Sequence, residues 1–402
     1  MENLSLCGTA VKALLLLMLS AALSSCEKFP VVDEPDDPSP VSLEELAYIF
    51  SRLPLEQEHL DEVHSAVCSS LENGYDEEYM MSDLFESPGA GVGAAEAATK
   101  AASGRWKRPL RSLLEDYLEQ AYVTRADAVL PAPGSAAEYI SVLTQSDAQI
   151  YWPYSEDWDG SSMPVITFDP GDGMTANIGY EMRPDGSVKE VVVTERTAKE
   201  RPVWVMNRND DSGYQTIEML RRQDPDWGKG GTIVIRKDTK AEGFDTSRTL
   251  ILKEFEATRN YDSWFAGASE FWVKAGSVDD FYATTEAEMR LYSPSITDFL
   301  VVVKRSQIGQ KIPFNAVIVS EWTEQLESLA FMITEDDGGT LTTWKCSAQV
   351  KIKSKGYGFD IEIPFNSRDD IVWRGQLTRK YLEKNNNVEG HFGDVYLTFG
   401  II

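Results

Sequence analysis

The sequence predicts an α+β protein: an N-terminal helical region, a β-rich central region and a C-terminal antiparallel β-sandwich. Up to about residue 147, apolar residues recur three or four positions apart, which is the spacing of a helix face. From Ala148 onward they form alternating, β-branched or aromatic runs that are separated by turn residues. Many short strands of this kind favour antiparallel sheets packed as a sandwich or barrel.

Residues 42–147 carry the helical pattern. Ser42 followed by Glu45 fits a capping box at the start of a first helix, and a second helix is expected over 55–71. The clearest amphipathic pattern is at 110–121, where apolar residues stand at i, i+3, i+4, i+7, i+8 and i+11. We expect this region to pack on a neighbour, because each helix has one apolar face.

Strands are expected in two series, a central region at 148–267 and a sandwich at 268–402. The central series comprises QIYW, PVITF, VKEVVVT, RPVWVM, TIVIR and TLILKEF. The second comprises EFWVKA, FLVVVKR, NAVIVSE, AFMITE, SAQVKIK, FDIEIPF and VYLTFG. The sequence RPDG at 183–186 is typical of a turn between strands. The segment 282–291 fits either a short helix or an edge strand.

Residues 1–25 have the layout of a secretory signal peptide. Lys12 precedes an apolar stretch at 13–23 that is long enough for a signal peptide and too short to span a bilayer as a helix. Residues 26–41 follow as an acidic, proline-rich segment. Such a segment cannot bury enough apolar surface to fold, so it predicts an extended tether.

The end of the apolar stretch, Leu23-Ser24-Ser25-Cys26, resembles the lipobox of bacterial lipoproteins. The resemblance implies cleavage before Cys26 and attachment of acyl chains such as palmitate to its thiol and new N-terminus, which together anchor the chain firmly in a membrane. The lipobox, the acidic leader and the start of the β region at 148–153 are similar to uncharacterised lipoproteins of gut Bacteroidota. That similarity implies an outer-membrane lipoprotein at the cell surface. A periplasmic face, and secretion without an anchor, stay open as alternatives.

The charge of the chain argues against nucleic acid as a partner, and its cysteine content argues against a disulfide scaffold. The chain has 38 basic and 65 acidic residues, a formal net charge of −27, which argues against binding nucleic acid through its general field. Beyond Cys26 the only cysteines are Cys68 and Cys346, which are far apart in sequence and predict buried thiols rather than a disulfide scaffold. The three histidines show no metal or nucleophile motif.

The stretch YWPYSEDWDG at 151–160 combines aromatic rings with carboxylates, a combination that suits a carbohydrate platform. The candidate platform residues are Trp152, Asp157, Trp158 and Asp159. The competing interpretation puts the aromatic rings in the core and leaves the acidic turn solvated. A further alternative is a glycoside hydrolase in which Asp157 and Asp159 form the carboxylate pair.

Acidic residues at strand ends predict a Ca²⁺ site, since hard cations take several oxygen ligands from adjacent loops. The ligands expected for it are Asp336, Asp337, Asp369 and Asp370. The segment FNSRDDIVWRG at 365–375 resembles a loop of C2 domains, although Pro364 and Asn366 stand where those domains carry acids. The alternative is that these are solvated turns.

These observations favour a cell-surface lipoprotein that is a non-catalytic binding or structural module. Its partners would be the membrane, through Cys26, and a glycan or protein ligand. The sequence assigns no catalytic residue and, apart from Ca²⁺, no cofactor. A carboxylate-based glycoside hydrolase and a calcium-dependent C2-like domain are the alternatives.

Overall fold

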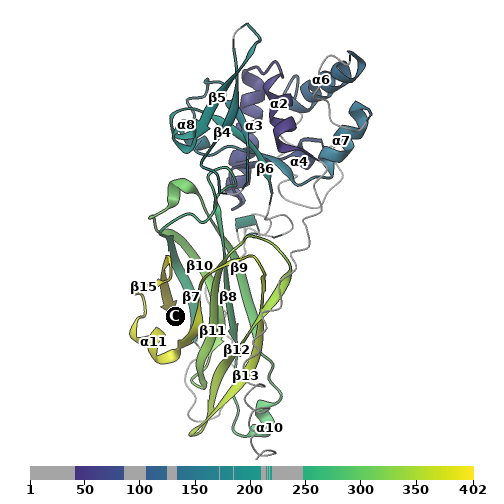
Figure 1. Cartoon of the computed structure of the whole chain (residues 1–402). Coiled ribbons are helices and arrows are strands. Elements are labelled where there is room, and N and C mark those ends of the chain that lie inside the picture. The colour runs from purple at the N-terminus through teal and green to yellow at the C-terminus, as the bar shows by residue number, and fades with distance from the viewer. Residues whose placement is uncertain are drawn as a thin grey trace, which may run out of the picture. The chain divides into compact units, whose positions relative to one another are not determined.

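The computed structural model describes residues 41–85, 106–124, 134–171, 173–183, 185–209, 214, 216, 218–219 and 248–402. Its helices lie mainly in the N-terminal part and its strands form three sheets, which confirms the predicted α+β class with a C-terminal sandwich (Figure 1). The predicted signal peptide, Cys26, almost all of the predicted tether and the predicted strand TIVIR lie outside the described residues.

Three of the N-terminal helices form where the helical spacing predicts them, and two more, α4 and α7, lie in the same predicted helical region. Their bounds are α2 (Leu43–Ser51), α3 (Gln57–Glu72), α4 (Met81–Phe85), α6 (Leu110–Thr124) and α7 (Ala136–Thr144). The predicted cap of α2 is confirmed, because the Ser42 hydroxyl accepts a hydrogen bond of 3.3 Å from the backbone N–H of Glu45. The helices bury their apolar faces in one core shared with a sheet.

That sheet has six strands in the order β1-β2-β6-β3-β4-β5. Their bounds are β1 (Glu78–Met80), β2 (Ala148–Tyr151), β3 (Val165–Phe168), β4 (Ala176–Met182), β5 (Val188–Thr194) and β6 (Val203–Arg208). All neighbours are antiparallel except β3 and β6, which are parallel. A 3₁₀ turn, η2 (Ser155–Asp157), follows β2, and helix α8 (Glu195–Glu200) follows β5.

Side chains alternate across this sheet as strand geometry requires. Trp204 and Met206 of β6 join the core under the helices, whereas Val203 and Val205 join a second core on the opposite face. The second core also contains Trp264 and Phe265, from the loop that leads into β8. Both faces of the central strands are therefore buried.

Two further sheets make the C-terminal sandwich. One has the order β10-β7-β16-β15, and the other has the order β13-β12-β11-β8-β9 with β14 also paired to β11. The strands are β7 (Arg248–Ala257), β8 (Ser269–Ser277), β9 (Ser295–Val303), β10 (Ile312–Trp322), β11 (Leu326–Glu335), β12 (Leu341–Ile352), β13 (Lys355–Asn366), β14 (Asp370–Thr378), β15 (Glu389–Phe392) and β16 (Val395–Ile401). Short helical pieces are α10 (Glu286–Met289), η3 (Arg305–Gln307) and α11 (Arg379–Lys384).

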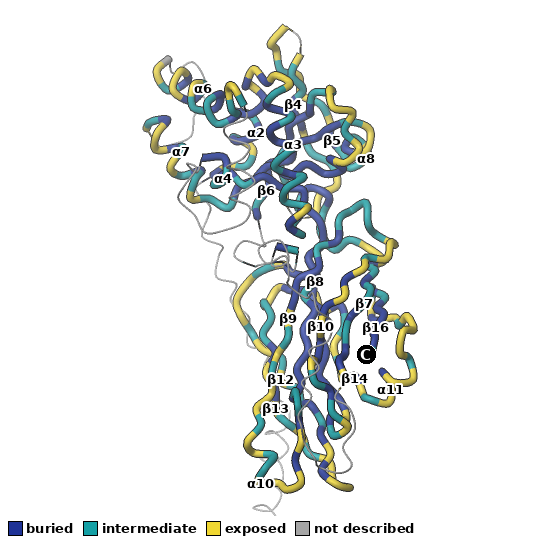
Figure 2. The backbone as a smooth tube through the Cα atoms, turned by 180° about the vertical axis from the view of Figure 1, so that it is seen from behind, coloured by how far each residue is buried: buried dark blue, intermediate teal, exposed yellow. Residues whose placement is uncertain are grey.

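Aromatic rings fill the space between the two sheets of the sandwich. Phe255 of β7 lies 5.2 Å from Phe271 of β8, and Phe331 of β11 lies 5.5 Å from Phe399 of β16, measured between ring centroids. Figure 2 shows the central strands of the sandwich as mostly buried. Burial of these rings removes large apolar areas from water and stabilises the sheet pair.

The structure groups the elements differently from the predicted boundaries. Strand β7 lies before residue 268, yet it pairs with β10 and β16 inside the sandwich. Strand β1 lies in the predicted helical region, yet it extends the sheet of the central region. The segment 282–291, for which the sequence fits either a short helix or an edge strand, contains the short helix α10. No helix among the described residues is long and apolar enough to cross a membrane.

Candidate functional site

A small cleft forms where η2 and the end of α8 face each other. Its volume is about 110 Å³, and its lining includes all four residues of the predicted platform. Asp157, Trp158 and Asp159 come from η2 and the chain just after it, and Lys199, Glu200 and Arg201 come from the end of α8. Segments that are about 40 residues apart in sequence thus meet at one cleft.

The two tryptophans of this cleft have different environments. Trp152 is 1% exposed and packs against Trp204 at 5.7 Å, so its ring belongs to the core under the helices. Trp158 is half-buried, and its indole N–H donates a 3.0 Å hydrogen bond to the carbonyl of Ser162. The Trp158 ring lies 5.0 Å from the His64 ring. The Trp158 ring, which lines the cleft, is therefore held in a fixed orientation.

Asp159 is exposed and organises the turn that follows Trp158. Its carboxylate accepts hydrogen bonds from the backbone N–H groups of Ser161 and Ser162, at 2.8 and 2.7 Å, and from both hydroxyls, at 3.2 and 2.6 Å. These bonds, first of all those from Ser162, lower the pKa of Asp159 to about 2. Asp159 is therefore ionised throughout the physiological pH range. Asp157, two positions earlier, is also exposed.

A buried carboxylate that sequence reasoning missed supports the opposite side of η2. Glu77 accepts hydrogen bonds from the backbone N–H of Ser155 at 2.8 Å, from its hydroxyl at 2.8 Å and from the N–H of Tyr154 at 3.3 Å. Burial raises the pKa of Glu77 well above its usual value, and the neighbouring Glu156 adds to the shift. Tyr154 has a φ of 60°, a left-handed conformation that these bonds help to hold.

The basic residues at the cleft are joined to acids. Arg201 donates to Glu181 at 2.6 Å, and Lys199 lies 3.3 Å from Glu195 and over the ring of Tyr154. The cleft therefore presents one half-buried indole ring beside carboxylates and cations with defined partners. Such a mixture can bind a polar ligand that has hydroxyl or amino groups.

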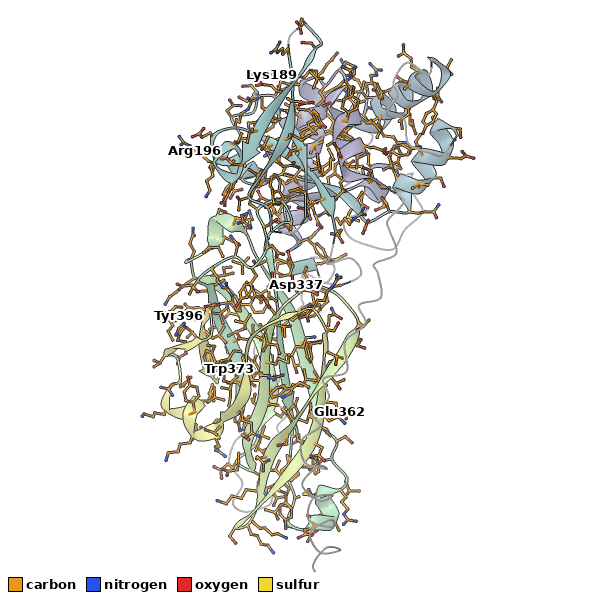
Figure 3. All side chains as sticks on the ribbon, in the orientation of Figure 1. Lys189, Arg196, Asp337, Glu362, Trp373 and Tyr396 are labelled. Atoms are coloured by element: carbon orange, nitrogen blue, oxygen red, sulfur yellow. The ribbon has the colours of Figure 1, made fainter. Side chains whose placement is uncertain are left out.

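The four acids predicted to bind Ca²⁺ lie together at one end of the sandwich, where Figure 3 labels Asp337. Two of them are already bonded to protein donors. Asp336 accepts from the N–H of Gly338 at 3.0 Å, the amide of Asn366 at 3.2 Å and the indole of Trp272 at 2.8 Å. Asp369 accepts from the N–H of Asn366 at 2.9 Å. These bonds stabilise the loop between β11 and β12 and the loop between β13 and β14.

Burial and neighbouring acids raise the pKa of two carboxyls at this end of the sandwich. Burial, with the charge of Asp336 in addition, raises the pKa of Asp369 to about 6. Burial raises the pKa of Asp262 to about 6 as well, where the charges of Asp337 and Asp76 add to the shift and a hydrogen bond with Glu335 opposes it. Each carboxyl therefore exchanges its proton between pH 5 and 7.

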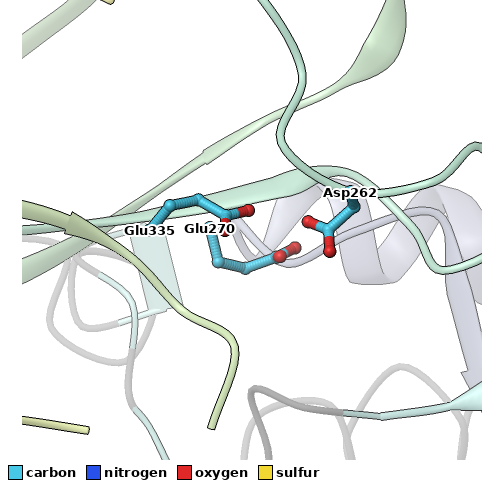
Figure 4. A group of neighbouring side chains, drawn as sticks. All are labelled: Asp262, Glu270 and Glu335. Atoms are coloured by element: carbon cyan, nitrogen blue, oxygen red, sulfur yellow. The ribbon is translucent and has the colours of Figure 1, made fainter. Parts of the chain in front are cut away.

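A tighter group of carboxylates lies next to the predicted metal ligands. One oxygen from each of Asp262, Glu270 and Glu335 lies within 4.8 Å of the other two (Figure 4). The sequence contains a partial signal for this group, since Glu335 directly precedes Asp336 and Asp337. Asp262 and Glu270 are more than 60 positions away from Glu335, and nothing in the local pattern connects them.

The two described cysteines, His59 and His391 all lie outside the cleft. Cys68 and Cys346 are half-buried and free rather than fully buried as expected. His59 is buried and accepts a hydrogen bond of 2.9 Å from the N–H of Glu56 at the start of α3. His391 stacks on Tyr396 at 4.5 Å.

Comparison with known proteins adds no relative. No family model matches this chain, no curated protein matches it, and no solved structure matches it.

Proposed function

We propose that this chain is a lipid-anchored cell-surface lipoprotein whose folded part binds a glycan in the cleft beside Trp158. The observation that carries the proposal is the geometry of that cleft. A half-buried indole ring, fixed by its bond to Ser162, stands next to the carboxylates of Asp157 and Asp159. Sugar rings stack their C–H faces on indoles and donate hydroxyl groups to carboxylates, so the pairing suits a saccharide.

Hydrogen bonding at Asp159 favours binding over hydrolysis. A carboxylate pair that cleaves glycosides needs one member that holds a proton near the working pH. Four hydrogen bonds from Ser161 and Ser162 stabilise the charged form of Asp159 instead. Its role in the proposal is to shape the turn and to accept ligand hydroxyls. These bonds exclude Asp159 as the proton donor, so the hydrolase alternative requires Asp157 in that role. In the proposal the module is non-catalytic.

A glycan array with the full-length protein tests the binding proposal, and hydrolysis of the same glycans is measured in parallel. We expect binding without turnover, a large loss of binding in Trp158→Ala and a smaller loss in Asp157→Asn. Asp185→Asn is the matched control, because Asp185 forms the same kind of turn, accepting from Ser187 at 2.9 and 2.6 Å, and does not line the cleft. Turnover that Asp157→Asn abolishes would establish the hydrolase alternative.

The proposed anchor rests on the resemblance of 23–26 to a lipobox and is tested separately. Cells fed a palmitate analogue should label the wild-type protein and not Cys26→Ser, and the serine variant should leave the membrane fraction. Cys68→Ser is the control, since its thiol lies in the folded part and its loss leaves labelling intact. Protease treatment of intact cells reports whether the protein faces outward. A Cys26→Ser protein that stays labelled would refute the anchor.

A further inference from the structure

The two cations that line the cleft beside Trp158 are neutralised by acids outside it. Lys199 lies 3.3 Å from a carboxylate oxygen of Glu195, and the guanidinium of Arg201 donates a 2.6 Å hydrogen bond to Glu181. Neither of these two acids lines the cleft. The cleft therefore offers little uncompensated positive charge to a ligand, although two basic residues line it.

The acids that line the cleft differ in how far protein groups compensate for them. Glu200 forms a 2.7 Å ion pair with Arg196, which lies outside the lining. Asp159 accepts four hydrogen bonds from the turn that follows it. Asp157 is exposed, and among the described residues no group donates to its carboxylate or forms an ion pair with it. Asp157 is thus the one charged residue of the lining that has no protein partner.

A carboxylate without a partner discriminates between the donors of a ligand. Hydrogen bonds between two ionised groups are stronger than those from a neutral hydroxyl, and an ammonium group also carries three donors instead of one. The formal net charge of −27 acts in the same direction, because it attracts cations and repels anions. A ligand with an ammonium group therefore gains more from Asp157 than one that has hydroxyl groups alone.

The Trp158 ring gives an independent reason for the same preference. It directly follows Asp157 in sequence, lines the same cleft and is oriented by its 3.0 Å hydrogen bond to the carbonyl of Ser162. The face of an indole attracts an ammonium ion through its π electrons, and tryptophan does so best among the aromatic side chains. A sugar ring that carries an amino group can therefore use the indole and the carboxylate together.

The size of the cleft limits which part of a glycan it can hold. Its volume is about 110 Å³, whereas pockets that enclose a whole drug-sized ligand measure about 300 to 1,000 Å³. We expect the cleft to take a single sugar residue while the rest of a longer glycan stays outside. Selection then depends on the substituents of that one residue.

We propose that Asp157 is the specificity-determining residue of the cleft and selects saccharides that carry a free, protonated amino group, of which glucosamine is the simplest. This inference rests on the proposed function, because it names the ligand class of the same cleft. Asp157 binds the ammonium group, and Trp158 contacts the ring that carries it. Uronic, sialic and sulfated sugars are disfavoured, since their anions would meet the charges of Asp157 and Asp159.

Calorimetric titration of the full-length protein with four β-1,4-linked tetrasaccharides tests this selection. The probes are the tetramers of glucosamine, N-acetylglucosamine, glucose and glucuronate, and the titrations are made at about pH 5.5, where amino groups keep their protons. The Kd for the glucosamine tetramer should be about tenfold lower than those for the two neutral tetramers, and the glucuronate tetramer should bind most weakly. Added NaCl at about 0.5 M should reduce the preference, because salt screens exposed charges.

Variants separate the role of Asp157 from the general acidity of the chain. Asp157→Asn should reduce the preference for the glucosamine tetramer to about twofold or less, and should change the Kd for the glucose tetramer less, because an amide still accepts hydroxyl groups. Asp185→Asn removes the charge of an equally exposed turn acid outside the lining and should keep the full preference.

The possible failures of this inference and of the proposed function are distinguishable. Equal wild-type Kd values for the glucosamine and N-acetylglucosamine tetramers would overturn the selection and leave glycan binding in place. A preference that Asp157→Asn retains, or that Asp185→Asn also loses, would overturn the role of Asp157. If none of the four tetramers binds and the glycan array is also blank, the proposed function fails and this inference fails with it.

Discussion

The side chain of Glu62 in α3 accepts a 2.7 Å hydrogen bond from the backbone N–H of Leu110, the first residue of α6. Glu62 is 6% exposed, and the N–H groups of a helix's first turn have no partner within the helix. The bond therefore satisfies a buried donor and joins two helices that are far apart in sequence. Burial raises the pKa of Glu62 to about 7, although the bond to Leu110 opposes the shift.

This relationship predicts that stability falls as pH rises from about 4.5 to 7. The folded pKa of Glu62 lies above the unfolded value of 4.5, so the folded state binds more protons within that window. Its stabilising contribution is complete below pH 4.5 and is lost as pH rises through 7. Glu62→Gln keeps an acceptor for Leu110 and should reduce this loss by about 3 kcal/mol. Urea unfolding at pH 4.5 and 8 measures it.

Glu119→Gln is the control for this prediction, because Glu119 is exposed on α6 and should not change the pH profile. If Glu62→Gln and wild type lose the same unfolding free energy between the two pH values, the proton is not held by Glu62.

Local patterns in the sequence predict the local part of this fold. Ser42 caps its helix as expected, and the spacing from Leu110 predicts α6, because both depend on residues within one or two turns. The predicted boundary at residue 268 puts strand β7 on the wrong side, since its partners β10 and β16 begin far along the chain. Pairing over such distances leaves no periodic signal.

The same distinction between local and long-range contacts decides which candidate site the sequence can predict. The cleft residues Asp157, Trp158 and Asp159 are adjacent in sequence, so their composition alone indicated a site. Asp262, Glu270 and Glu335 meet only because the β7–β8 loop and the end of β11 fold against each other. A chain with 65 acidic residues offers too many alternative groupings for sequence alone to select this one.

The core and cleft tryptophans should differ in their contribution to stability. Trp152→Ala is expected to lower the unfolding free energy by about 3 to 5 kcal/mol, because its buried ring leaves a cavity beside Trp204. Trp158→Ala should cost less, about 2 kcal/mol, since that ring is only partly buried in the native state. Chemical denaturation of both variants measures the difference. Equal losses would place both rings in the core and remove the proposed binding surface.

Gly393, in the turn between β15 and β16, should not tolerate a side chain. Its φ is +62°, and a Cβ added there would overlap the backbone carbonyl oxygen of Val372. Gly309 has a similar φ of +72°, but a Cβ there meets no atom of the described residues within 4 Å. Gly309→Ala should therefore cost about 1 kcal/mol from backbone strain alone. Gly393→Ala should cost at least about 2 kcal/mol more, because the turn must move away from β14. Similar midpoints in urea for the two variants would contradict the close approach.

The buried ion pair of Arg305 gives the last prediction. Its side chain is 9% exposed and connects Glu195, which follows β5, to the loop carrying Asp262 and Gly267. Arg305→Met keeps the volume of the stem but leaves the carboxylate and both carbonyls without this donor. The unfolding free energy should fall by about 2 kcal/mol, since both carbonyls lose a donor while Glu195 keeps Tyr154 and Lys199 as partners.

Arg196→Met is the matched control for Arg305→Met. Arg196 forms a 2.7 Å ion pair with Glu200, but its side chain is 85% exposed (Figure 3). Exposed ion pairs at i and i+4 on a helix contribute little to stability, because water screens them. A double-mutant cycle with Glu195→Gln isolates the part of the loss that belongs to the Arg305–Glu195 pair, and the bonds to the two carbonyls account for the remainder. If Arg305→Met unfolds at the same urea concentration as Arg196→Met, then Arg305 is solvated in solution and does not hold the Asp262 loop in place.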